Sequence, residues 1–333
     1  MLKVTGLTKK FGDLVAVDHI DFGVKEGEIF GFLGPNGAGK STTIRLLCTL
    51  SRPTEGTAKV AGFDIVKQDG KVRERIGLVS EKMIMYNDLK ARENLKLFGK
   101  LYDIPDDVLE KRIDELLGFV HMEKWANTRI GTFSTGMKKR INVIRALVNQ
   151  PSILFLDEPT LGLDPQSTSE VRELIRRINR ENKTTMILTT HMMIEADMLC
   201  DKIGIIDRGK IVALDTSSNL KKLVSGTDTT ILEFEIPNLG PGLVSALRSL
   251  PCVKSALQEE ETRVKVSATG EDCFDHVVDA VRKNGGKVKT VKNLEPSLED
   301  VFLHITGRQV RDSVSDKVPM PRGPHGGLEA TGG

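Results

Sequence analysis

The chain has 333 residues, of which 39% are hydrophobic and 28% are charged, a composition typical of globular proteins and a length sufficient for two domains. With 48 basic and 46 acidic residues the net charge is +2, so no strong positive field favours nucleic acid. No apolar run approaches the roughly 18 residues of a membrane-spanning helix, and the first residues show a strand pattern rather than a signal peptide. The four cysteines are widely spaced and form no C-x-x-C pair, which predicts reduced thiols and argues against a zinc site or a disulfide framework.

The first half of the chain predicts strands followed by a helical segment. Residues 2–33 have the pattern of short strands joined by turns, and strands are also expected at residues 57–62 and 76–79. Beyond them the apolar period becomes helical, with apolar side chains three and four residues apart between Leu109 and Val120. We predict a helical subdomain over about residues 84–149.

A continuous apolar run at residues 152–156 predicts a parallel strand that is buried on both faces. The same α/β pattern continues, so we place the end of this first domain at residue 222, followed by a linker at residues 223–228. The further elements expected in the first domain are a helix through residues 171–178, strands at 185–188 and 202–206, and a hairpin at 207–210.

Residues 227–307 are predicted to form a separate, smaller α+β domain. Between residues 230 and 291 the expected order is strand, helix, strand, strand, helix, strand, the ferredoxin-like order, and a short helix follows at 297–306. The tail at residues 308–333 is rich in Pro and Gly with few apolar residues, which predicts disorder.

The sequence G-P-N-G-A-G-K-S-T fits the phosphate-binding P-loop pattern. An apolar run precedes it and a helical pattern follows, which makes an ordinary Gly-rich turn a poor explanation. Its glycines let backbone amides point at phosphate oxygens, its lysine can reach the outer phosphates, and its serine hydroxyl can bind Mg²⁺. The residues predicted to bind nucleotide here are Gly34, Pro35, Asn36, Gly37, Ala38, Gly39, Lys40, Ser41 and Thr42.

Three further positions are candidates for nucleotide chemistry. Asp157 and Glu158 follow the buried strand at residues 152–156, at the sheet edge where α/β proteins bind ligands. Asp157 can hold Mg²⁺ and Glu158 can act as general base for an attacking water, whereas the alternative is that the pair only caps the next segment. Phe11 could stack on an adenine ring or could be a core residue.

A second phosphate site is predicted at the start of another helix. Ser134 and Gly136 precede the helical pattern at residues 138–148, where backbone amides and the helix dipole favour an anion. The alternative is that Ser134 is only an N-cap. Two phosphate sites in one chain make sense if each nucleotide is shared between two subunits.

Together these motifs resemble the ATP-binding subunit of an ABC (ATP-binding cassette) transporter. Residues 34–42 look like its Walker A motif, residues 153–158 like Walker B, and residues 133–140 like the signature motif. The resemblance implies a P-loop NTPase fold, ATP and Mg²⁺ as cofactors, and a head-to-tail homodimer or a dimer with another ATPase subunit. It also implies that His191 is the switch histidine and that Asp164 lies in the D-loop.

The sequence departs from the commonest pattern of this family at three places. The signature reads Phe-Ser-Thr-Gly-Met rather than Leu-Ser-Gly-Gly-Gln, yet its phosphate-facing Ser134 and Gly136 are kept. Phe11 replaces the commoner tyrosine, and stacking needs only the ring. Glu81 stands where a glutamine is expected; it could bind Mg²⁺ or be an ordinary solvated glutamate.

The C-terminal sequence, including residues 296–303, resembles ATPases of two-component drug and antibiotic exporters. It implies an ATPase motor at the cytoplasmic face of the membrane that drives export through a separate integral membrane permease. Three alternatives are import, a soluble ABC ATPase acting on ribosomes or DNA, and a module that binds nucleotide without hydrolysis. A single cassette without a heptad run argues against a soluble ATPase acting on ribosomes or DNA. An intact Glu158 and His191 argue against a module without hydrolysis.

Overall fold

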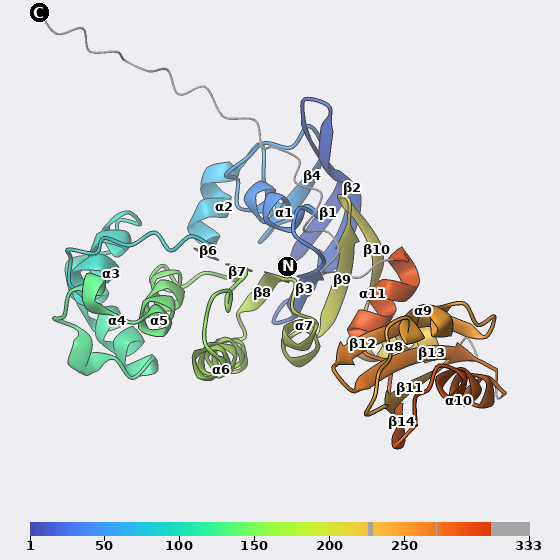
Figure 1. Cartoon of the computed structure of the whole chain (residues 1–333). Helices are drawn as coiled ribbons and strands as arrows, with labels where there is room; N and C mark the ends of the chain where they lie inside the picture. Colours follow the sequence, from blue (N-terminus) through green and yellow to red (C-terminus); the bar gives the residue numbers. More distant parts are fainter. Residues whose placement is uncertain (226–228, 271, 308–333) are drawn as a thin grey trace, which may run out of the picture.

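The computed structural model describes residues 1–225, 229–270 and 272–307 (Figure 1). A six-stranded sheet forms the centre of the first domain, and only its edge strand β10 runs antiparallel to its neighbour. Its strands, in order across the sheet, are β10 (Lys210–Asp215), β9 (Lys202–Asp207), β3 (Ile29–Leu33), β8 (Thr185–Thr190), β7 (Ile153–Asp157) and β6 (Ile76–Val79).

A second, antiparallel sheet packs over one face of the central sheet, with helix α1 (Lys40–Leu47) in the same core. Its strands, in order, are β2 (Leu14–Val24), β1 (Leu2–Phe11), β4 (Glu55–Val60) and β5 (Phe63–Asp64). The remaining helices of this domain outside the helical subdomain are α2 (Asp69–Arg75), α6 (Pro165–Asn182), α7 (Met193–Leu199) and α8 (Ser217–Ser225).

The predicted helical segment lies to one side of the sheet (Figure 1). It consists of α3 (Ala91–Lys100), α4 (Asp106–Phe119), α5 (Thr135–Arg145) and two short 3₁₀ turns, Glu123–Trp125 and Ile130–Thr132. Leu109, Ile113 and Leu117 form the buried face of α4, as their spacing predicts.

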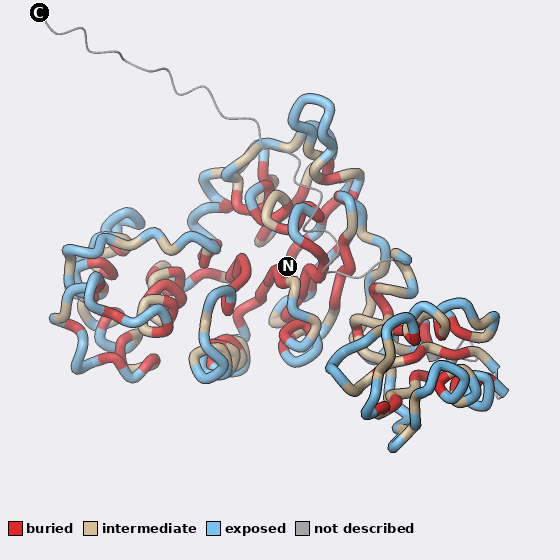
Figure 2. Tube along the Cα trace, viewed as in Figure 1, coloured by how far each residue is buried: buried red, intermediate tan, exposed pale blue. Residues whose placement is uncertain are grey.

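Strand β7 is buried along its whole length (Figure 2). Ile153 and Phe155 pack into the core beneath the antiparallel sheet, whereas Leu154 and Leu156 pack into the core shared with α6 and the helical segment. Successive strand residues point to opposite faces, so a strand covered on both faces must be apolar throughout. The expectation of a doubly buried strand is confirmed.

The C-terminal elements form a four-stranded antiparallel sheet with strand order β12-β13-β11-β14. Their sequence order reproduces the predicted ferredoxin-like pattern. In chain order they are β11 (Thr229–Glu235), α9 (Leu243–Arg248), β12 (Val253–Glu260), β13 (Arg263–Thr269), α10 (Cys273–Lys283), β14 (Thr290–Leu294) and α11 (Leu298–Thr306).

The prediction that all cysteines are reduced is wrong for two of them. Cys252 and Cys273 form a disulfide, with Cα atoms 5.6 Å apart, whereas Cys48 and Cys200 are free thiols. The bonded pair is separated by 21 residues in the sequence. The fold brings them together because β12 and α10 begin at the same side of the C-terminal core, a proximity that sequence spacing does not reveal.

The predicted linker at residues 223–228 is partly wrong, because α8 continues to Ser225. Val224 is buried in an apolar cluster that α8 shares with α11, and this packing favours helix up to that point. Residues 226–228 lie outside the described residues, as does the tail at 308–333, which was predicted to be disordered.

Helix α11 packs against the first domain although it follows the C-terminal sheet in sequence (Figure 1). Its buried side chains Leu298, Val301 and Phe302 share a core with Leu33, just before the P-loop, and with Ala196 of α7. The two domains therefore have an apolar core in common. In the described parts of the chain no helix is both long and apolar enough to cross a membrane.

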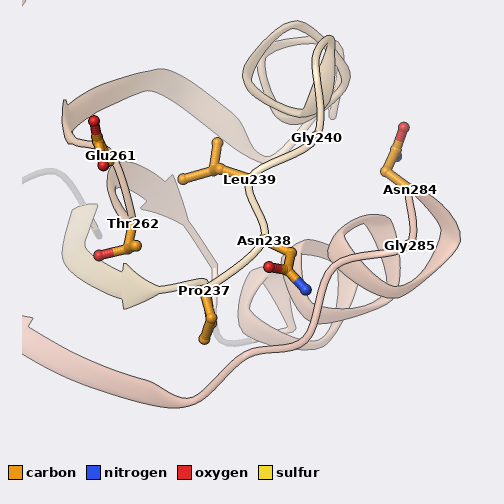
Figure 3. A pocket seen from close by; sticks show the side chains of 8 residues that line it. All are labelled: Pro237, Asn238, Leu239, Gly240, Glu261, Thr262, Asn284 and Gly285. Carbon is orange, nitrogen blue, oxygen red and sulfur yellow. The ribbon is translucent and has the colours of Figure 1, made fainter.

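A hollow lies on the C-terminal domain (Figure 3). It is bordered by the turn after β11, the β12–β13 turn and the end of α10, through Pro237, Asn238, Leu239, Gly240, Glu261, Thr262, Asn284 and Gly285. Only Glu261 is charged, and the cluster of charged side chains described below lies elsewhere, at the ends of β3 and β7.

Candidate active site

The P-loop connects β3 to α1, as its sequence context predicts. Its glycines are required by space and by backbone conformation. A Cβ at Gly34 would lie 2.2 Å from the carbonyl oxygen of Ile206, and one at Gly39 would lie 2.4 Å from that of Ala16. Gly39 also has a φ of 106°, which side-chain-bearing residues rarely adopt.

Lys40 is buried beneath this loop and is 4% exposed. Its ammonium donates hydrogen bonds to the carbonyl oxygens of Gly34 (2.8 Å) and Pro35 (3.1 Å) and lies 3.3 Å from Glu158 Oε1. Burial lowers the pKa of Lys40, and the charge of Glu158 opposes that shift. The structure thus brings together two residues that the sequence assigned separately to nucleotide chemistry.

Ser41 and Asp157 meet where α1 faces the end of β7. The Ser41 hydroxyl donates a hydrogen bond to Asp157 Oδ1 at 2.9 Å, and Thr189 Oγ1 donates to the same oxygen at 2.6 Å. Asp157 is 7% exposed, so its carboxylate is held mainly by these hydroxyl groups. A hydroxyl beside a carboxylate is a combination of oxygen ligands that suits Mg²⁺.

Glu158 lies at the end of β7 in the left-handed region, with φ of 48°. Its Oε2 is 2.9 Å from Nδ1 of His191, which follows β8. Burial alone would raise the pKa of Glu158, but the hydrogen bond from His191 and the charge of Lys40 lower that pKa below its usual value. The same hydrogen bond raises the pKa of His191, against the effect of burial.

The second predicted phosphate site lies at the N-terminus of α5. Ser134 is the N-cap, and its hydroxyl accepts a hydrogen bond from the Met137 N–H at 3.2 Å. Ser134 is exposed and Gly136 is buried against Ser167. Among the interactions of the described residues, neither Ser134 nor Gly136 has a hydrogen bond or ion pair with the P-loop. Asp164 is the N-cap of α6 and accepts a hydrogen bond from the Ser167 N–H at 2.9 Å.

The two remaining candidates, Phe11 and Glu81, lie on the surface. The ring of Phe11 is 45% exposed, with Lys9 Nζ 4.9 Å from its centroid, so the alternative of a core residue is excluded. Glu81 is exposed just after β6 and has no hydrogen bond or ion pair with the residues that the structure describes.

Sequence reasoning missed several residues of this site because they belong to it only through the strand order. Thr189 holds Asp157 from the neighbouring strand β8, and its carbonyl and hydroxyl both accept hydrogen bonds from the Glu158 N–H. Lys139 of α5 donates to the Glu158 carbonyl, and Glu195 of α7 is fully buried beside Thr160. Lys139 lies within the predicted signature motif at residues 133–140, and for Glu195 the signal in the sequence is a charged side chain on an otherwise apolar helix face.

Comparison with known proteins places this site in a family. The sequence profile described as ABC transporter matches residues 17–161. The linearmycin resistance ATP-binding protein LnrL of Bacillus subtilis is 37% identical over 314 residues, which cover 94% of this chain and 100% of that protein. The chain belongs to the ATP-binding proteins of ABC transporters. The doxorubicin resistance ATP-binding protein DrrA of Mycobacterium tuberculosis is 36% identical, covering 91% of this chain and 92% of that protein.

Solved structures agree with the family assignment. A dimeric ATP-binding cassette bound to ADP and Pi superposes with a TM-score of 0.59 at 28% identity, over 65% of this chain and 98% of that one. The ABC transporter component cbiO1 of Clostridium perfringens gives a TM-score of 0.62 at 28% identity, over 68% and 94% of the two chains. The predicted ABC ATPase with a P-loop NTPase fold is therefore confirmed.

Proposed function

We propose that this ABC ATPase drives the export of a drug-like or antibiotic-like small molecule through a separate membrane permease, from the cytoplasmic face of the membrane. The supporting observation is that proteins aligned over nearly the whole chain, the C-terminal domain included, are named for linearmycin resistance, daunorubicin resistance and Nod factor export. Import and a role on ribosomes or DNA are not favoured by these relatives.

Inside-out vesicles that contain the chain and its permease test this proposal. We expect ATP-dependent uptake of a fluorescent anthracycline into such vesicles, since their interior corresponds to the cell exterior. ATP-dependent release from preloaded vesicles of the same orientation would contradict export. The Lys40→Ala variant is the matched control for energy coupling, because it removes the ammonium of the P-loop.

We assign the catalytic roles by position. Glu158 accepts the proton of the attacking water, His191 fixes the orientation of that carboxylate, and Lys40 together with the P-loop amides holds the phosphates. Phe11 offers an exposed ring for the adenine. Catalysis then rests on orientation and on charges that are in place before the reaction begins.

Mg²⁺ fits between α1 and β7. Ser41 and Asp157 would hold it, and the bound ion would neutralise the phosphate charge that develops during transfer. Within the described residues no three His, Cys, Asp or Glu side chains cluster into a metal site. This agrees with an ion that takes most of its oxygens from phosphate and water, as Mg²⁺ does.

We infer a head-to-tail dimer in which Ser134, Gly136 and Asp164 of one subunit face the nucleotide bound to the P-loop of the other. The exposed N-terminus of α5 supports this arrangement, because its free amides suit a phosphate that the same chain does not supply. Gel filtration of the full chain with and without ATP tests it. A monomer at saturating ATP under non-hydrolysing conditions would contradict the shared site.

The role of residues 227–307 is a separate proposal: they form a domain that supports dimerisation or regulation and is not needed to bind ATP. All P-loop and Walker B residues lie outside it, but α11 covers apolar residues of the cassette. We therefore expect its deletion to preserve mononucleotide affinity while lowering ATPase activity and thermal stability. Loss of ATP binding by a truncation that still shows a native circular dichroism spectrum would contradict this proposal.

A further inference from the structure

A lysine buried behind Walker B has no role in the mechanism given above. Lys139 lies in the first turns of α5 and is 2% exposed. Its ammonium donates a hydrogen bond to the carbonyl oxygen of Glu158 at 3.2 Å. Burying a lysine is costly unless its charge is paired and its protons are hydrogen-bonded, so a purely space-filling role would be served better by an apolar side chain.

The electrostatic surroundings make this burial tolerable. Burial lowers the pKa of Lys139, and the attraction of Glu195, followed by those of Glu81, Asp157 and Glu158, opposes that shift. Glu195 is itself 0% exposed, accepts a hydrogen bond from Thr160 Oγ1 at 2.7 Å and lies 3.8 Å from Arg172 Nε. Lys139 thus lies among carboxylates from α7, from the end of β7 and from the segments that follow β6 and β7, and its hydrogen bond ties α5 to the turn after β7.

The atom that Lys139 holds belongs to a constrained turn. Glu158 has a positive φ of 48°, and a residue with a side chain stays in that region only where its surroundings fix it. The Glu158 N–H is bound by Thr189, and its carbonyl accepts from the Leu161 N–H at 3.3 Å as well as from Lys139. Of these contacts, only that of Lys139 comes from the helical subdomain.

The same helix carries the second phosphate site at its N-terminus. Ser134 and Gly136 begin α5, and Lys139 follows about one turn later on its buried face. A displacement of α5 on contact with a phosphate therefore reaches the Glu158 carbonyl through one hydrogen bond. In the proposed dimer that phosphate belongs to the nucleotide of the other subunit.

We propose that Lys139 is a positioning residue that links the signature helix of each subunit to the turn bearing that subunit's own Glu158. Occupancy of one ATP site then sets the geometry for hydrolysis at the other. This inference rests on the proposed function, specifically on the shared nucleotide sites. It assigns a role to a residue that touches neither nucleotide, since Lys139 acts through the main chain of Glu158.

Steady-state ATPase measurements on the full chain test the proposal. Lys139→Met keeps the length of the side chain but removes its charge and its donors. We expect kcat to fall about tenfold, because small displacements of a reacting group have effects of this order or larger. We expect KM to stay within about twofold and the Hill coefficient to fall from above one to about one, since the coupling between sites is lost.

Two variants separate this role from a general loss of packing. Lys139→Arg keeps a charged donor and should restore most of the rate and the Hill coefficient. Arg112 donates a hydrogen bond to the main-chain carbonyl of Val148, just after α5, at 2.7 Å. Arg112→Met removes that bond and should change neither kcat nor the Hill coefficient. If Lys139→Met does not fold, Lys139→Gln replaces it, with an uncharged donor on a shorter side chain and an expected loss of about threefold in kcat.

The measured kcat, KM and Hill coefficient decide whether Lys139 links α5 to the turn at Glu158. The proposal would be overturned if folded Lys139→Met kept the kcat and the Hill coefficient of the wild type. It would also be overturned if the wild-type chain itself had a Hill coefficient of one. A fall in kcat that Lys139→Arg does not restore, accompanied by a rise in KM, would reduce Lys139 to a packing residue. Failure of the underlying function is distinguishable, because the wild-type chain would then show no ATP-dependent dimer or no hydrolysis.

Discussion

Strands β6 and β7 are paired in the parallel sheet, and a glutamate follows the end of each: Glu81 after β6 and Glu158 after β7. Glu158 is 6% exposed and is contacted by Lys40 and His191, whereas Glu81 is exposed and has no hydrogen bond or ion pair within the described residues. The two carboxylates follow neighbouring strands at the same end of the sheet, yet they differ in exposure and in contacts because their surroundings differ. Strand β7 lies between β8 and β6, whereas β6 is the outermost strand of the sheet.

The largest expected effect concerns the enclosed glutamate. Glu158→Gln keeps the shape of the side chain but cannot accept a proton, so we expect kcat for ATP to fall by at least about 100-fold. ATP binding should persist and an ATP-bound dimer should accumulate. Phosphate release and gel filtration with ATP measure these outcomes. Hydrolysis within about threefold of wild type, roughly 0.65 kcal/mol of barrier, would remove Glu158 from the role of general base.

Local features of this sheet edge were predictable from the sequence, whereas contacts between distant segments were not. The P-loop and the strand ending in Asp157 were predictable because their signals are local: a glycine pattern, an apolar run and two carboxylates. Thr189 and Lys139 were missed because their contacts depend on which strands and helices become neighbours. The Cys252–Cys273 disulfide and the packing of α11 on the cassette escaped prediction for the same reason.

The segment after Glu81 provides the second prediction. Ile84 and Tyr86 are 59% and 54% exposed, whereas Met85 packs partly against the buried core. An apolar run at residues 83–86 can either pack inside the helical subdomain or form a dock for the permease. Because the exposed pair is free to contact a partner, we propose that it receives a short helix of the permease.

Ile84→Glu combined with Tyr86→Glu tests this dock more cleanly than glutamates at Met83 and Met85, since Met85 also contributes to the fold. Burying two unpaired carboxylates at an interface is costly, so we expect co-purification with the permease to fall by at least about tenfold. Nucleotide affinity and thermal stability should stay at wild-type values. Replacing exposed Leu214 and Val212 of β10 with glutamate is the matched control. Normal co-purification and transport by the test variant would exclude this patch.

The third prediction concerns how the Glu158–His191 ion pair contributes to stability at different pH values. The raised pKa of His191 means that its contribution to stability is complete below the usual value of 6.5 and is lost as the pH rises through the raised value. The lowered pKa of Glu158 keeps that carboxylate charged from its usual value of 4.5 upward. The pair is therefore strongest between about pH 4.5 and 6.5 and weakens at higher pH.

His191→Gln should consequently lower the melting temperature by a few degrees at pH 6, with a smaller difference at pH 9. Glutamine has no charge to lose in this range, so the difference between variant and wild type isolates the titration of the histidine. Differential scanning calorimetry at both values of pH measures it. His276→Gln is the control, because that histidine is exposed on α10, in the C-terminal domain and away from Glu158. A difference that grows towards pH 9 would contradict the proposed ion pair.

The smallest expected effect concerns Glu81 itself. Among the described residues, none binds its carboxylate through a hydrogen bond or ion pair, so any influence of Glu81 on Mg²⁺ passes through solvent. Charges a few ångströms apart in water interact by only about 1 kcal/mol. If Glu81 turns toward the metal when nucleotide is bound, Glu81→Gln should raise the Mg²⁺ concentration for half-maximal ATPase activity by about threefold. Nucleotide binding without metal should hardly change. Superimposable Mg²⁺ titrations for Glu81→Gln and wild type would show that Glu81 is a solvated surface glutamate. Of the two glutamates, Glu158 would then be the one that acts on the nucleotide.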